Sequence, residues 1–291
     1  MDGIISTGLI GLIGLSLGTQ YALLSLGFTL IFGILGVINF SHGGFYIVGG
    51  YAAYSLSHLV GVPFPLAVVF ATLFCAALGY GVEYFLIEPR VNDHLATMMI
   101  TLGIYLIMTT GTTAIFGPEP PEFRFPVAGS FRQHGFYIPY ANLIVFVVCT
   151  LVIAGVYLLM FRTRFGVALR AMADDRAVAS AQGLHPARLF PMAFALATGL
   201  AGLTGALVTP ILALDPHVGD SVLAKSFMVV ILGGLGSIGG ATIAAFLVGI
   251  FEAYSSVYLG GSKGALALFV FVLVILVVRP TGLMGRVARR A

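Results

Sequence analysis

The sequence predicts an all-α fold, a polytopic membrane helix bundle with about eight transmembrane helices and one short re-entrant or half helix. Two observations lead to this prediction. Hydrophobic residues make up 59% of the 291 residues and charged residues only 9%, whereas a soluble domain carries about 25% charged residues. In addition, charged residues are absent from long stretches, the longest of which runs from Asp2 to Glu83. A spanning helix needs roughly 20 apolar residues, and in hydrocarbon its backbone groups must pair within the helix.

Nine helical segments are expected in chain order. The first charge-free stretch is long enough for about three helices, and the second of these is expected to break near residues 36–43. The seventh segment is too short to cross a bilayer comfortably and accounts for the predicted half helix. The expected segments are 7–28, 30–57, 63–87, 94–116, 139–161, 189–213, 223–235, 238–258 and 264–279.

The basic residues predict the orientation of the chain. Ten of the 14 Lys and Arg residues lie in the segments 84–93, 162–188 and 279–291, the last of which holds Arg286, Arg289 and Arg290. Cytoplasmic loops are enriched in Lys and Arg, so these segments are expected in the cytoplasm. The C-terminus is then cytoplasmic, the N-terminus is periplasmic, and the proline-rich loop 117–138 faces outward.

The cytoplasmic segment 162–188 is too polar to enter the bilayer. Good helix formers run from Arg164 to Arg176, Gly183 is a natural stop, and Pro186 lies beyond it. Its alanines leave a smooth surface against which another protein could pack. The composition leaves two interpretations open, namely a docking surface and a solvated loop whose arginines set the topology.

A polar segment, Asn39-Phe40-Ser41-His42-Gly43-Gly44, interrupts the apolar N-terminal region. Polar groups at membrane depth are costly unless they face a cavity or a partner helix, and interrupted helices often line a substrate path. The alternative interpretation is a simple turn in which Asn39 or Ser41 caps the next helix.

The segment Gly233–Gly240 reads GGLGSIGG and contains the spacing G-x-G-x-x-G at Gly234, Gly236 and Gly239. A dinucleotide site would require a soluble βαβ unit and an acidic residue further on, and this context is absent. We interpret the segment as a break between two half-membrane segments or as a site of close helix packing.

Neither a catalytic site, a metal site nor a cofactor is expected from the sequence. The chain has only two lysines, Lys225 and Lys263, and no P-loop, so it cannot hydrolyse a nucleotide by that chemistry. The basic residues are explained by topology and require no nucleic-acid partner. Glu252, within an apolar helix, is expected either to pair with Lys225 or Lys263 or to lie at the membrane interface.

Several motifs, in this order along the chain, resemble the branched-chain amino acid ABC permeases of the high-affinity leucine, isoleucine and valine type. Within that family the chain is similar to the shorter of two permease types, and the resemblance covers essentially the whole chain. The motifs are Gly18–Gly27 (GTQYALLSLG), Thr29–Gly43 (TLIFGILGVINFSHG), Arg170–Arg176 (RAMADDR) with Gly183, Gly233–Gly240, and Arg279–Leu283 (RPTGL).

The resemblance implies a single permease domain over residues 1–291 of a binding-protein-dependent importer in the bacterial inner membrane. The implied partners are a second, different permease subunit, two cytoplasmic ABC ATPases and an extracytoplasmic solute-binding protein, in contact with the lipid bilayer. The alternatives are a stand-alone secondary carrier or a channel, and the scarcity of acids within the membrane argues against the carrier.

The resemblance also implies that segment 162–188 is a coupling loop that docks onto an ATPase. Related importers carry Glu-Ala-Ala before a glycine, and counting back from Gly183 places Ala177 at the Glu position; Asp174 and Asp175, one helical turn earlier, are candidates to replace that acid. The expected coupling residues are Arg170, Asp174, Asp175, Arg176, Ala177 and Gly183. The expected residues of the path or of helix breaks are Asn39, Ser41, His42, Gly43, Gly233, Gly234, Gly236 and Gly239.

Overall fold

The computed structural model describes residues 2–91, 93–133 and 136–285, so Arg286, Arg289 and Arg290 lie outside the described residues. The fold is all-α, as predicted. Over the described residues, the strands are β1 (Ser130–Gln133) and β2 (Phe136–Pro139), an antiparallel hairpin that pairs Ser130 with Pro139.

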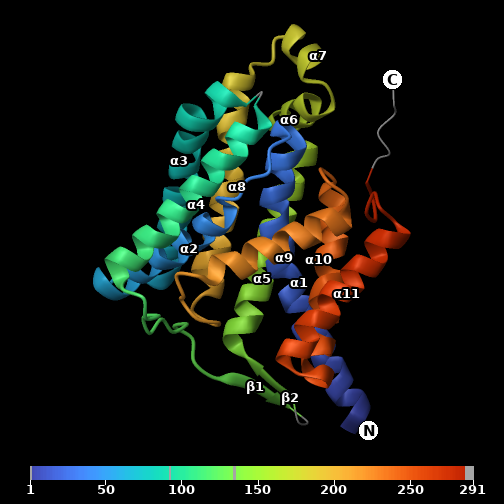
Figure 1. Cartoon of the computed structure of the whole chain (residues 1–291). Helices are drawn as coiled ribbons and strands as arrows, with labels where there is room; N and C mark the ends of the chain where they lie inside the picture. The colour runs from blue at the N-terminus through green and yellow to red at the C-terminus, as the bar shows by residue number, and fades with distance from the viewer. Residues whose placement is uncertain (1, 92, 134–135, 286–291) are drawn as a thin grey trace. The chain divides into compact units, whose positions relative to one another are not determined.

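Seven helices among the described residues are long and apolar enough to cross a membrane. Four further helices in this part of the chain are shorter (Figure 1). The long helices are α1 (Asp2–Leu35), α3 (Phe64–Val82), α4 (His94–Phe116), α5 (Tyr140–Arg162), α8 (Pro186–Val208), α10 (Ile238–Leu259) and α11 (Gly261–Val278); the short ones are α2 (His42–Tyr54), α6 (Arg164–Asp174), α7 (Arg176–Ala181) and α9 (Val218–Gly233). Helical turns of other types extend α2 to Leu59 and α3 to Arg90.

The predicted boundary at residues 28–30 was wrong, because α1 continues without interruption to Leu35. Apolar residues continue through this region, and the first glycine with a left-handed backbone is Gly36, at φ +70°. The expected break near residues 36–43 is confirmed, since α2 begins at His42. The short seventh segment corresponds to α9, which begins earlier than expected, at Val218.

The chain divides into two compact units. The first unit comprises Met1–Thr29, Phe125–Leu151 and Lys225–Ala291, and the second comprises Leu30–Arg124 and Val152–Ala224.

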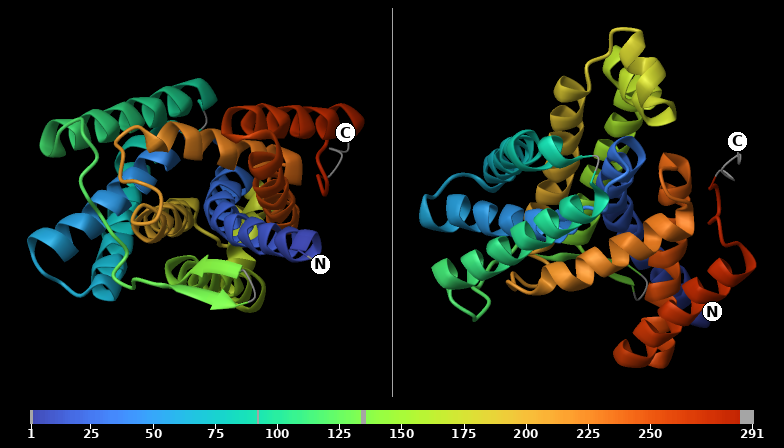
Figure 2. Two further views of the ribbon diagram at one scale, coloured as in Figure 1. Left: turned by 90° about the horizontal axis from the view of Figure 1, so that it is seen from below. Right: turned by 45° about the horizontal axis from the view of Figure 1, so that its top comes forward.

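The second unit is built around α8, which packs against α2 and α3 (Figure 2). Small residues bring the backbones together. A Cβ atom added to Gly49 of α2 would collide with the backbone of Gly202 in α8, and one added to Gly205 would collide with the carbonyl of Tyr46. Close approach of this kind is how membrane helices associate when lipid offers no hydrophobic driving force.

Helix α3 shows why these residues suit a membrane. Its buried face carries Ala67, Ala71, Cys75 and Gly79. Large apolar side chains occupy its exposed face, at a spacing of three and four residues. They are Leu66, Val69, Phe70, Leu73 and Phe74. An exposed apolar face of this kind is typical of a helix that contacts lipid.

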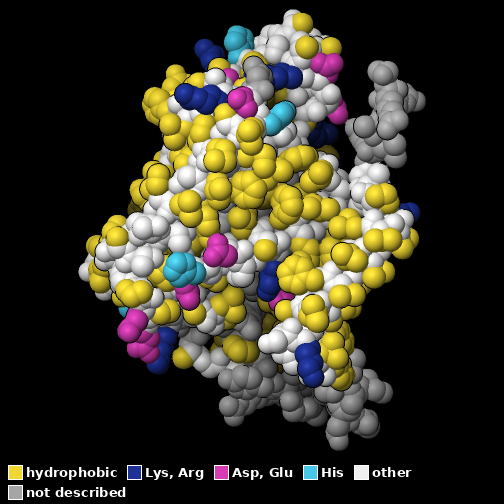
Figure 3. Space-filling model, in the orientation of Figure 1, with side chains coloured by type: hydrophobic (Ala, Val, Ile, Leu, Met, Phe, Trp, Pro, Cys, Tyr) yellow, Lys and Arg dark blue, Asp and Glu magenta, His cyan; other side chains and the backbone are white. Residues whose placement is uncertain are grey.

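The surface of the second unit repeats this pattern. Charged side chains and histidines gather at the end that carries α6 and at the opposite end, where the chain leaves α4, with a band of hydrophobic side chains between them (Figure 3).

Both cysteines of the chain, Cys75 and Cys149, are free and buried, as expected for packing residues.

The first unit contains the antiparallel neighbours α10 and α11 and the N-terminal part of α1. A Cβ atom on Gly14 of α1 would lie 2.6 Å from Cα of Ile250, and one on Gly18 would lie 2.9 Å from Cα of Phe246. The numbering therefore runs in opposite directions along the two helices, so α1 and α10 pack antiparallel with their backbones in close contact.

Candidate functional site

The break between α1 and α2 lies inside the second unit, where Asn39, Ser41 and His42 are fully buried. The Oδ1 atom of Asn39 accepts hydrogen bonds from the backbone N–H of Ser41 at 3.0 Å and from its hydroxyl at 2.5 Å. The segment is tied to α4 by Thr101, whose hydroxyl accepts from the N–H of Phe40 at 3.3 Å. The break is therefore ordered and buried within the bundle.

The predicted cap of α2 differs in detail from the observed one. Ser41 occupies the N-cap position, but its side chain makes no capping hydrogen bond and donates to Asn39 instead. The side-chain N–H group of Asn39 has no hydrogen-bond partner among the described residues. The next residue of the set, Gly43, lies against the carbonyl of Gly219 in α9, which a Cβ atom would approach to 2.6 Å. A role for these residues in a solute path stays a prediction.

The second glycine-rich segment separates α9 from α10 in the first unit. Helix α9 ends at Gly233, Gly234 and Gly236 have φ angles of +100° and +79°, and the Ser237 hydroxyl accepts from the N–H of Gly240 to begin α10. A Cβ atom on Gly233 would lie 2.5 Å from the backbone N of Ala241. The segment thus combines a sharp turn with close packing of the two helix ends.

The structure brings this glycine segment together with the C-terminal motif, which the sequence did not indicate. The N–H groups of Leu283 and Met284 donate to the carbonyls of Leu232 and Gly233 at 2.7 and 3.0 Å. A Cβ atom on Gly234 would meet Cα of Gly285 at 2.6 Å. The residues that follow α11 therefore satisfy the free carbonyls at the end of α9. The only sequence signal for this contact is indirect: both segments are motifs of the same family resemblance, although they lie far apart in the chain.

The predicted coupling segment forms two short helices of the second unit, α6 and α7, which lie beyond the end of α8 (Figures 1 and 2). Each begins with a side-chain cap. The Thr163 hydroxyl accepts from the N–H of Gly166 at 3.1 Å, and the Asp175 carboxylate accepts from the N–H of Val178 at 2.9 Å. Gly183, at φ +89°, ends the second helix as expected.

One face of this pair of helices is attached and the other is open. Leu169, Met172 and Ala179 are buried, and Arg176 lies over the ring of Phe190 in α8, at 4.8 Å from the centroid. Arg170 lies in the same way over Phe161. The open face consists of exposed residues, among them Val178 with 53% of its surface accessible. Further exposed residues are Asp174, Asp175, Ala177 and Gly183.

Three polar side chains of the first unit meet where α1, α9 and α10 lie together. The ammonium of Lys225 in α9 donates to the carboxylate of Glu252 in α10 at 2.6 Å, and the hydroxyl of Tyr21 in α1 donates to the same carboxylate at 2.6 Å. Lys225 also donates to the hydroxyl of Tyr21 at 3.0 Å. Of the pairings considered for Glu252, the one with Lys225 is observed. Tyr21 was not predicted to take part, although this residue lies within Gly18–Gly27, the first motif of the resemblance.

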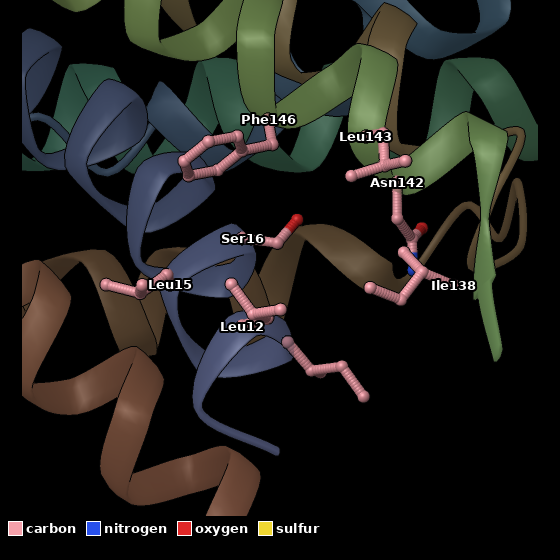
Figure 4. A pocket seen from close by; sticks show the side chains of 8 residues that line it. Leu12, Leu15, Ser16, Ile138, Asn142, Leu143 and Phe146 are labelled. Atoms are coloured by element: carbon pink, nitrogen blue, oxygen red, sulfur yellow. The ribbon is translucent and has the colours of Figure 1, made fainter. Parts of the chain in front are cut away.

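An apolar cavity of about 80 Å³ lies between α1 and the start of α5, also in the first unit. Among the described residues that line it, only Ser16 and Asn142 have polar side chains, and Phe146 and Leu143 close it from the side of α5 (Figure 4). The lining formed by these described residues is therefore almost entirely apolar and carries no charged side chain.

Residues 11–279 match the family model described as "Branched-chain amino acid transport system / permease component". The permease protein BraD of a high-affinity branched-chain amino acid transport system in Pseudomonas aeruginosa is 29% identical, over 94% of both chains. LivH of Escherichia coli K12, with the same type of name, is 29% identical over 94% of both chains.

A second type of permease protein is also similar. LivM of Escherichia coli K12 is 26% identical over 91% of this chain but only 67% of its own length. The chain thus corresponds in length to the LivH type. Together with the apolar helices, these matches place the protein among multi-pass inner-membrane transport subunits. The chain belongs to the branched-chain amino acid transport system permease component family, a family of ABC permeases.

Proposed function

We propose that this chain is one of two different permease subunits of a binding-protein-dependent ABC importer that carries branched-chain amino acids into the cell. Its two units work as a single permease domain over residues 1–291. Two cytoplasmic ATPases supply the energy and an extracytoplasmic protein delivers the solute, so the chain itself performs no catalysis. The names of the BraD, LivH and LivM relatives support the solute and the pairing of two permease types.

The observation that carries this proposal is the pair of helices α6 and α7. They are capped, anchored to α8 through Arg176 and Phe190, and exposed on the face that carries Asp174, Ala177 and Val178. A rigid element that is fixed on one side and open on the other can transmit a movement of a docked protein to the membrane helices. A solvated loop, the other interpretation of this segment, needs neither caps nor anchors.

The orientation that follows has the N-terminus in the periplasm and the C-terminus in the cytoplasm. It places α6 and α7 with their five nearby arginines on the cytoplasmic side, where the ATPases act. Asp174 and Asp175 then supply the acidic groups near the docking face, because Ala177 leaves the usual acidic position neutral. Asp175 caps α7, and Asp174 precedes it on the exposed face.

The test is reconstitution of the chain in proteoliposomes with the second permease, the ATPases and the binding protein. We expect uptake of radiolabelled leucine, isoleucine or valine that requires both ATP and the binding protein. Uptake that proceeds equally without either of them would indicate a secondary carrier or a channel and would overturn the proposal.

The docking assignment has a separate test with a matched control. Val178→Asp places a charge in the exposed face of α7, and we expect the ATPases no longer to copurify with the permease. Val127→Asp makes the same change at an exposed position in the loop after α4 and is expected to leave copurification unchanged. Equal copurification of both variants would remove the docking role from α7.

A further inference from the structure

The cluster of Tyr21, Lys225 and Glu252 lies wholly within the first unit, and Tyr21 and Glu252 belong to helices that are long and apolar enough to cross a membrane. Glu252 follows Ile238 by 14 residues and precedes Leu259 by seven, about 21 Å and 10 Å from the two ends of α10 at 1.5 Å per residue. Tyr21 lies near the middle of the apolar span Ile10–Leu35. The ion pair of Arg124 with Glu122, in contrast, lies in an exposed loop.

The close contact of α1 and α10 brings Tyr21 and Glu252 together. Gly18 and Gly249 let the two backbones touch, since a Cβ atom on Gly249 would lie 2.7 Å from Cα of Gly18. Tyr21 and Glu252 each follow one of these glycines by three residues. Side chains lean toward the N-terminus of their own helix, so in this antiparallel pair Tyr21 and Glu252 lean toward each other. Lys225 then reaches both from α9.

The charged groups are not sealed inside the protein. The side chain of Lys225 keeps 32% of its surface accessible and that of Glu252 keeps 17%. A charge in contact with the hydrocarbon of the bilayer is costly, and charged residues in membrane helices face a protein interior or a water-filled cavity. The accessible side of the cluster is therefore expected to face water within the membrane.

We propose that this cluster lines the solute path and binds the charged groups of a zwitterionic amino acid. The ammonium of Lys225 receives the α-carboxylate of the solute, the carboxylate of Glu252 receives its α-ammonium, and the hydroxyl of Tyr21 keeps its hydrogen bond to Glu252. This inference rests on the proposed function, because it takes an amino acid as the solute.

The exchange is balanced in charge. The cluster holds one cation and one anion, and a zwitterion adds one of each, so no charge in the membrane is left without a counter-charge at any stage. A solute that lacks either charged group would leave Lys225 or Glu252 without its new partner. The Lys225–Glu252 pair closes again when the solute leaves, and the geometry seen here is that closed state.

Chemical rescue at position 225 tests the proposal in the reconstituted complex. Lys225→Cys removes the cation, and an aminoethyl methanethiosulfonate reagent then restores an ammonium through a disulfide. We expect the maximal uptake rate of radiolabelled leucine at saturating binding protein to fall at least tenfold in Lys225→Cys. The aminoethyl reagent should return it to within about threefold of the wild-type rate, and the uncharged methyl reagent should not. Wild-type protein treated with the same reagents is the control for Cys75 and Cys149, which are buried.

Two further variants separate solute contact from folding. Lys225→Met/Glu252→Gln is neutral and leaves no unpaired charge, and its maximal uptake rate should also fall at least tenfold while the ATPases and the second permease still copurify. Lys263→Met changes the only other lysine, which is exposed in α11, and should transport at the wild-type rate.

Three results would overturn the inference: normal uptake by Lys225→Cys, equal rescue by the methyl reagent, or an introduced thiol at position 225 that mass spectrometry shows to be unreactive in intact membranes. The last measurement needs no transport and therefore tests the water-facing cluster even in a preparation that imports nothing. Loss of ATP-dependent uptake by the wild-type complex, in contrast, would contradict the proposed function and not the reactivity of this thiol.

Discussion

In both units, glycines bring the backbones of two helices into contact, and the units differ in the side chains that lie next to these contacts. In the second unit, α8 touches α2 through Gly205 and Gly202, and the groups around these contacts are neutral. In the first unit, α1 touches α10 through Gly18 and Gly249, and an ion pair lies one helical turn away.

The difference shows which polar groups serve packing and which require another explanation. Neutral small residues are sufficient to hold membrane helices together, so the contact between α2 and α8 needs no charged group. The Lys225–Glu252 pair adds a desolvation cost that packing does not require. Changes at the glycine contact of the second unit should therefore affect folding, and neutral replacement of both members of the ion pair should mainly affect transport.

The largest expected effect is on folding and comes from Gly205→Ala. The added Cβ atom would collide with the backbone carbonyl of Tyr46, which cannot move as a side chain can. We expect the free energy of unfolding to fall by about 3 kcal/mol or more. The measurement is the thermal unfolding midpoint in detergent, which should be lower than that of the wild type. The control is Gly103→Ala in α4, where nothing lies within 4 Å of the new Cβ atom. Similar midpoints for the two variants would contradict the packing described for α2 and α8.

An intermediate effect is expected when the ion pair is broken from one side. Lys225→Met leaves the Glu252 carboxylate without its cation, and we expect the free energy of unfolding to fall by about 2 kcal/mol. This loss is smaller than the ~3–5 kcal/mol for a fully buried pair, because 32% of the Lys225 side chain and 17% of the Glu252 side chain stay accessible. Lys225→Met/Glu252→Gln should recover most of this loss in a thermal unfolding assay. A double variant as unstable as the single one would indicate that the pair is needed for folding.

A smaller effect is expected at the break between α1 and α2. Asn39→Ala removes the acceptor of the two hydrogen bonds from Ser41, leaving a buried N–H and hydroxyl to find other partners. The expected loss is about 1–2 kcal/mol, again from thermal unfolding. Ser41→Ala removes only one of these bonds and serves as the graded control, with a smaller loss. No loss in either variant would show that this polar segment is not held by Asn39.

Much of the fold could be predicted because the membrane simplifies the relation between sequence and structure. Charge-free stretches located the helices, and the glycines of segment 36–43 and of segment 233–240 located both breaks. The end of the first helix could not be located, because the residues around Thr29 are apolar and helix-compatible and nothing local distinguishes one long helix from two.

The sites were harder to predict because they depend on which helices are neighbours. Lys225 lies 204 residues after Tyr21 and 27 residues before Glu252, and no spacing rule joins the three residues. The binding of Leu283 to the end of α9 is equally non-local. The helices α6 and α7, in contrast, are local, and Gly183 and the helix-forming residues before it were enough to predict helix in this segment. The division into two helices at Asp175 was not predicted.

The central claim is that coupling resides in α6 and α7 while solute contact resides in the Lys225–Glu252 cluster, and one experiment tests both parts together. ATP hydrolysis and leucine uptake are measured in the same proteoliposomes for Val178→Asp and for Lys225→Met/Glu252→Gln. We predict that Val178→Asp loses both activities, whereas the double variant retains hydrolysis stimulated by the binding protein and loses at least nine-tenths of its uptake. A double variant that loses hydrolysis in proportion to uptake, or that imports leucine at the wild-type rate, would contradict the account.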